Sequence, residues 1–187
     1  MTQPSPWALA LGLALLAGAC ASGNTVSEKR ASVQQMRAET LAKLYRHEPG
    51  SREQIRRAAG YAVFSNVGVN LVLLSAGGGH GVVRDNATGR DTYINMGSAG
   101  VGIGLGVKDF RGVFVFTDRK VMQWFVEQGW DGSAQADAAA KAGRKGGAWA
   151  GAVDVAPGIK LYQITENGLA LQATIQGTKY WKDGELN

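Results

Sequence analysis

Few residues in this chain combine the types and spacings that catalysis or metal binding requires. The chain has two histidines, His47 and His80, and its single cysteine lies far from both, so no Cys/His metal-ligand spacing exists. His47 falls at a predicted helix end, where a cation suits the helix dipole. Ser98 lacks the glycine that a nucleophile elbow needs two residues earlier. We therefore predict no catalytic residue, no metal and no cofactor. An enzyme is not expected, and an unrecognised hydrolase is the weakest alternative.

Basic side chains are more informative. The formal net charge is +5, which favours anionic partners such as a membrane surface or nucleic acid. Two sets of residues are candidates for contact with an anionic membrane surface, although the residue types alone favour simpler roles. The solvent face of two N-terminal helices carries Lys43, Arg46, Arg52, Arg56 and Arg57, and a glycine-rich loop carries Arg144, Lys145 and Trp149. The alternatives are a solvated surface for the cations and core packing for the indole. We predict no nucleic acid partner.

The N-terminus resembles an export signal. Residues 1–27 carry no charge, and the apolar run 7–19 has signal-peptide length. It leads into Cys20 through "LLAGAC", which resembles a bacterial lipobox, whose cysteine is lipidated. Ala17 replaces the usual leucine, and no basic residue precedes the run, so an ordinary A-x-A cleavage site is the main alternative and an uncleaved anchor is a weaker one. Both cleavage sites place the cut before Cys20, and the absence of aspartate at position 21, which is Ala21, resembles outer-membrane rather than inner-membrane sorting. With one cysteine, no intrachain disulfide can form.

Two helices are predicted before residue 60. Over 27–50 the apolar residues fall near helical spacing on one face, and Pro49-Gly50 ends the helix. Ser51 with Gln54 indicates a capping box that opens a second helix through Ala59.

From Tyr61 the pattern changes to that of strands. Residues 61–74 are uncharged and rich in β-branched and aromatic residues, which predicts one or two buried strands. A break is predicted at 75–81, a hairpin turn at 86–89, and another turn at 107–112 before a strand that ends at 116.

The remaining chain predicts a helix and a second hairpin. The helix follows a cap at Thr117 or Asp118 and stops at Gly129. A short alanine helix and a basic glycine loop follow. The last hairpin turns at 166–168, and its second strand alternates apolar residues: Leu169, Leu171, Ala173 and Ile175.

The segment 96–107 alternates glycine with aliphatic residues between 100 and 107. The P-loop pattern fails because Lys108 is one position too late after Gly106 and no hydroxyl follows it. The dinucleotide fingerprint fails because Leu105 stands where glycine is needed, and the stretch is short for a membrane span. We predict a strand with one bare face. Close approach of another element, most simply a docked helix, explains that face better than a ligand.

Several ordered blocks resemble the SYLF family: "YAVFSN" (61–66), "GGGHGVV" (77–83), "GSAGVGIGLG", "VFVFTD" (113–118), "FVEQGW" (125–130) and the segment 162–187. The resemblance covers about Ser32 to Asn187. It implies phospholipid binding, with phosphoinositides favoured in eukaryotic relatives and actin bound by some. It carries over no catalytic residue.

Together these observations predict an α+β fold, with N-terminal amphipathic helices packed on a strongly bent antiparallel β-sheet or flattened barrel. The expected organisation is a signal peptide (1–19), a lipidated cysteine with a short linker (20–31) and one SYLF-like domain (32–187). We expect a phospholipid-binding domain anchored by lipid at the periplasmic face of the bacterial outer membrane. The alternative is a non-catalytic envelope scaffold with a protein partner, and the oligomeric state is left open.

Overall fold

The first described element is a long helix whose start is set by its cap. The computed structural model describes residues 23–131, 151–165, 168–170 and 178–187. Helix α2 (Val26–His47) opens with a capping box, in which the Glu28 amide donates to the Thr25 hydroxyl (3.2 Å) and the Thr25 amide donates to the Glu28 carboxylate (2.9 Å). Val33, Met36 and Leu44 form its buried stripe. The helix therefore includes the end of the segment predicted as a linker.

Helix α3 (Ser51–Arg57) is shorter than predicted, and its predicted capping box is wrong. Its N-cap is Gly50, which has no side chain to accept a hydrogen bond. The Ser51 hydroxyl instead donates to the Glu48 carbonyl at 2.6 Å. The Gln54 side chain accepts a hydrogen bond from the buried Tyr162 hydroxyl, so it anchors the helix to the sheet rather than capping it.

Strands β1 (Gly60–Asp85) and β2 (Asp91–Phe116) are each 26 residues long and pair antiparallel along their length, from Gly60↔Phe116 to Arg84↔Asp91. The breaks predicted at 75–81 and 107–112 are therefore wrong, because both segments continue the ladder. The predicted turn between these strands is confirmed. The Asp85 carboxylate accepts from the amides of Ala87 (2.9 Å) and Thr88 (3.2 Å).

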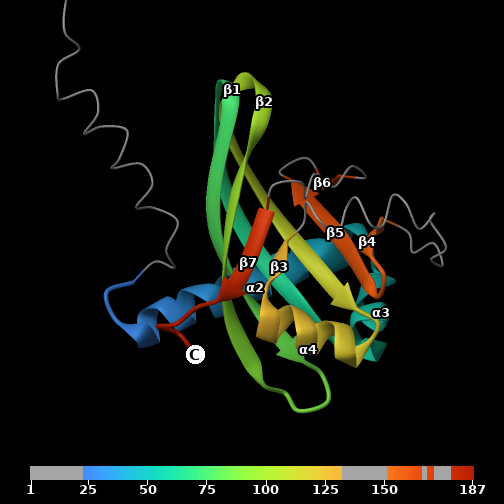
Figure 1. Cartoon of the computed structure of the whole chain (residues 1–187). Helices are drawn as coiled ribbons and strands as arrows, with labels where there is room; N and C mark the ends of the chain where they lie inside the picture. The colour runs from blue at the N-terminus through green and yellow to red at the C-terminus, as the bar shows by residue number, and fades with distance from the viewer. Residues whose placement is uncertain (1–22, 132–150, 166–167, 171–177) are drawn as a thin grey trace, which may run out of the picture.

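This two-stranded ribbon folds back on itself. Figure 1 shows both strands running to a crest and returning, and a register shift occurs between Val72 and Leu74. The residues that flank the two ends of β1 meet, because the backbone amide of Asn86 donates to the Ala59 carbonyl at 3.1 Å. At Gly81, a Cβ atom would lie 2.7 Å from Phe64 Cε1 and closer still to the Val63 carbonyl oxygen. Gly79 and Gly81 of β1 therefore lie close to the backbone of residues 63–66.

Five shorter strands complete an antiparallel sheet in the described part of the chain, in the order β3-β7-β2-β5-β4, with β1 on β2 and β6 on β5. Their bounds are β3 (Trp130–Asp131), β4 (Val153–Ala156), β5 (Ile159–Thr165), β6 (Gly168–Ala170) and β7 (Thr178–Lys182). The antiparallel β5–β6 pair confirms the predicted C-terminal hairpin. The positions of Leu171, Ala173 and Ile175 lie outside the described residues.

Helix α4 (Arg119–Gln128) begins and ends as predicted. The Asp118 carboxylate accepts from the amides of Lys120 (2.6 Å) and Val121 (3.3 Å), and Gly129, with φ +75°, follows the last turn. Because cap chemistry involves only neighbouring residues, it could be predicted from the sequence.

The sheet separates two hydrophobic cores. Phe64, Phe114 and Phe116 face one core with Met122 and Phe125 of α4. The alternate residues of the same strands, Val63, Val113 and Val115, face the other core. Helices α2 and α3 cover this second core. The predicted α+β class and its strongly bent antiparallel sheet are confirmed. None of the described helices is long and apolar enough to cross a bilayer.

Candidate functional site

The structure brings part of the predicted lipid site together where α2 ends and α3 begins. We call Lys43, Arg46, Arg52, Arg56 and Arg57 the helical basic patch. The Arg52 guanidinium lies over the Tyr45 ring, 4.4 Å from its centroid, and so links the two helices. Arg46 is exposed, whereas Lys43 is half-buried and has a partner. The patch is therefore a real surface, but its members are not equally available.

Glu53 lies within this patch and offsets part of its charge. Its carboxylate accepts from Arg56 (2.6 and 2.7 Å) and from Arg57 (2.5 Å). The hydrogen bond from Arg56, followed by that from Arg57 and the attraction of both charges, lowers the pKa of Glu53 to about 2 despite some desolvation. The spacings i,i+3 and i,i+4 made this pairing visible in the sequence, and our prediction of the patch omitted it.

The other predicted site residues cannot be placed. Cys20, Arg144, Lys145 and Trp149 all lie outside the described residues. The side chains of 100–110 are likewise undescribed, although their backbone continues β2 as the predicted strand.

Two exposed indoles were not predicted from the sequence. Trp124 on α4 is 44% exposed, and Trp181 on β7 is 47% exposed. Trp124 borders a mainly apolar surface depression of about 340 Å³, together with Lys120, Pro157 and Ile159. Helical spacing could have identified Trp124, because Met122 and Phe125 define the buried face and leave it outside.

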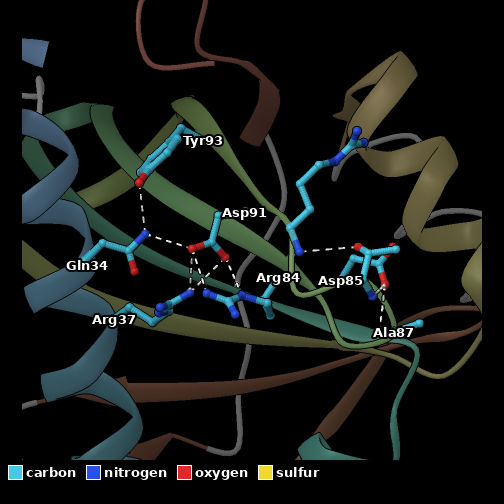
Figure 2. A network of polar contacts seen from close by, with 9 residues as sticks. Gln34, Arg37, Arg84, Asp85, Ala87, Asp91 and Tyr93 are labelled. Atoms are coloured by element: carbon cyan, nitrogen blue, oxygen red, sulfur yellow. Dashed lines mark hydrogen bonds and ion pairs between the residues drawn. The ribbon is translucent and has the colours of Figure 1, made fainter. Parts of the chain in front are cut away.

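A polar network between α2 and the start of β2 was also missed. In Figure 2 the Asp91 carboxylate points toward Arg84, Arg37 and Gln34. It accepts from Arg84 (2.5 and 2.8 Å), Arg37 (3.0 and 3.1 Å) and Gln34 (3.0 Å), and Gln34 also donates to the Tyr93 hydroxyl at 3.0 Å. These partners are more than 50 residues apart in sequence except for Arg84, so no local pattern indicates them. The network fastens α2 to the sheet.

Among the residues that the structure describes, no group of three His, Cys, Asp or Glu side chains is arranged to hold a metal ion. The described surface carries exposed cations and two exposed indoles.

No protein-family model matches the chain. The chain is similar to Beta cell expansion factor A of Aeromonas veronii, with 34% identity over 162 residues. The similarity covers 87% of this chain and 60% of that protein, so the chain spans 60% of its relative's length.

Proposed function

We propose that this chain is a SYLF-family domain that binds anionic phospholipid at a bacterial envelope membrane. The assignment to the family is supported by the ordered sequence blocks of residues 61–66, 77–83, 113–118 and 125–130, and by the relative that aligns over 87% of the chain. The confirmed α+β fold, with helices covering a bent sheet, agrees with the expected architecture.

The observation that carries the proposal is the exposure of the helical basic patch. Arg56 and Arg57 side chains are 69% and 75% exposed, and Arg46 and Arg52 are exposed beside them. Their helices bury their apolar stripe on the sheet, which leaves the charged face for a partner. A cation near an anionic membrane surface contributes about 1 kcal/mol, so two such residues correspond to roughly a thirtyfold change in binding.

A matched pair of variants tests this proposal on the chain without residues 1–20. Arg46→Gln with Arg57→Gln removes two exposed cations from the patch, of which Arg57 belongs to a surface ion pair. The control, Lys120→Gln with Lys179→Gln, removes two exposed cations elsewhere, of which Lys179 belongs to a surface ion pair at 3.4 Å. Both variants have the same net charge. Co-sedimentation is measured with vesicles of phosphatidylcholine alone and of phosphatidylcholine mixed with phosphatidylglycerol.

We expect the patch variant to bind the anionic vesicles roughly thirtyfold more weakly than wild type, the control to lose much less, and salt to weaken wild-type binding because exposed charges are screened. Equal losses in the two variants would show that net charge alone drives association. Far-ultraviolet circular dichroism establishes that each variant is folded.

We propose that a lipidated Cys20 tethers this domain to the periplasmic face of the outer membrane, after removal of residues 1–19. Mass spectrometry of the N-terminal peptide from a bacterial host is expected to show a diacylated or triacylated cysteine. A free thiol at Cys20, or a peptide that retains residues 1–19, contradicts the tether without affecting the lipid-binding test.

The second candidate is an envelope scaffold that contacts a protein. The exposed Trp124 beside its apolar depression favours it, because exposed aromatic side chains in pockets are typical of protein interfaces. Wild-type protein that binds neither kind of vesicle would favour this candidate.

A further inference from the structure

A basic depression lies at the opposite end of α2 from the helical basic patch. Its volume is about 450 Å³, and its lining includes Arg30 of α2, Arg90, Asp91 and Thr92 at the start of β2, Lys182 of β7 and Asn187. The C-terminus lies beside the start of α2 in Figure 1, so three segments distant in sequence meet here.

The carboxylate of this depression is already fully engaged. Asp91 accepts five hydrogen bonds, from Arg84, Arg37 and Gln34, which occupies the acceptor sites of a carboxylate. Two of these donors are guanidinium groups, so the charge of Asp91 is more than balanced before the other cations are considered. It does not neutralise Arg30, Arg90 or Lys182.

Arg30 is held in position with donors to spare. Its Nε donates to the Leu186 carbonyl at 2.9 Å, and its guanidinium lies over the Tyr93 ring, 5.7 Å from the centroid. Leu186 itself is 2% exposed, so this anchor is part of the core. The two terminal nitrogens of Arg30 make no hydrogen bond with the described residues.

Arg90 and Lys182 are exposed and complete the cationic wall. Neither forms an ion pair within residues 23–131, 151–165, 168–170 and 178–187. Both also border a smaller depression of about 90 Å³ that Asp85 and Glu127 line. The Asp85 carboxylate pairs with Arg119 at 2.8 Å. Glu127 is the other acid that lines this smaller depression.

We propose that this depression binds a phosphate group. Two guanidiniums offer planar pairs of donors that match phosphate oxygens, an ammonium adds a point charge, and the Thr92 hydroxyl adds a neutral donor. The phosphate belongs either to a lipid headgroup or to a soluble molecule, since the depression recognises the anion itself. This site is separate from the helical basic patch and does not depend on it.

The full chain, labelled with ¹⁵N, is titrated with inorganic phosphate at constant ionic strength, and amide shifts are followed by NMR. The test variant is Arg90→Gln with Lys182→Gln, because neither side chain has a structural partner among the described residues. The matched control is Lys120→Gln with Lys179→Gln, which also removes two exposed cations. A vesicle arm compares phosphatidic acid, whose headgroup is a phosphate monoester, with phosphatidylglycerol.

We expect saturable shifts at Thr92, Tyr93 and Asn187 in wild type and control, and binding at least roughly tenfold weaker in the test variant. Loss of preference for phosphatidic acid vesicles in the same variant assigns the phosphate to a lipid, and unchanged vesicle binding assigns it to a soluble molecule. Shifts that never saturate, or that are equal in the test variant, refute the site. Refutation of the phosphate site leaves the proposed function standing, because vesicle binding through the helical basic patch is tested with variants of other residues.

Discussion

Replacing Gly81 with alanine places a methyl group where the two halves of β1 meet. The new Cβ would lie 2.7 Å from Phe64 Cε1 and closer still to the Val63 carbonyl oxygen. Neither neighbour is free to move. Phe64 is 1% exposed and packs edge-on against Phe114, with ring centroids 5.6 Å apart, and Val63 is paired with Val113 in the ladder.

Overpacking of this kind costs about 1–3 kcal/mol. Because Val63 and Phe64 are both held in place, we expect a cost at the upper end of this range. For a chain of this size, 1 kcal/mol shifts the Tm by about 2–4 °C, so Gly81→Ala is expected to melt roughly 6–12 °C below wild type. That loss is a large part of a total stability of about 5–15 kcal/mol.

Thermal unfolding followed by circular dichroism measures this shift. The matched control is Gly184→Ala, because a Cβ at Gly184 meets no atom within 4 Å. Its Tm is expected to stay within about 2 °C of wild type. A Tm for Gly81→Ala as close to wild type as that of the control would refute the close contact between the two halves of the ribbon.

Three further predictions concern α4, the helical basic patch and the response to alkali. Asp118→Ala removes the side chain that caps α4 and is expected to cost about 1 kcal/mol, measured by chemical denaturation; an unchanged midpoint would show that the cap is dispensable. Glu53→Gln frees Arg56 and Arg57 from their shared acid, so co-sedimentation with anionic vesicles is expected to strengthen roughly fivefold, about 1 kcal/mol, if that patch binds lipid; weaker binding would contradict this. Burial, with a smaller contribution from Glu48, raises the pKa of Tyr162 to about 12 from 10.0. Since only the unfolded state ionises between these values, stability is expected to fall as the pH rises from 10 to 12. Denaturation midpoints should fall less steeply over this range in Tyr162→Phe, and an unchanged slope would assign the effect elsewhere.

Features decided by neighbouring residues could be predicted from the sequence. The limits of α4 depend on Asp118 and Gly129, and the turn after β1 depends on Asp85 and the residues that follow it. Alternation of side chains in 113–116 likewise assigns each residue to one of two cores.

Features decided by distant residues could not be predicted in this way. Glycine runs ordinarily mark breaks, but residues 77–81 pair with β2, and Gly79 and Gly81 lie against the backbone of residues 63–66. No local pattern in the sequence indicates these contacts. The same holds for the candidate sites. The cations of the helical basic patch are close in sequence and were found. The basic depression joins Arg30 to residues 90 and 182, so no spacing along the chain indicates it.

The attachment of α2 has a consequence for the order of events during synthesis. Lys29 pairs with Glu185 at 2.7 Å and Arg30 bonds to Leu186, contacts that span 156 residues. Helix α2 is synthesised well before residues 185 and 186, which hold its first turns. Its apolar stripe of Val33, Met36 and Leu44 therefore has no complete docking surface on the nascent chain. During that interval the stripe is open to a chaperone, and α2 is fastened only once residues 185 and 186 have been made.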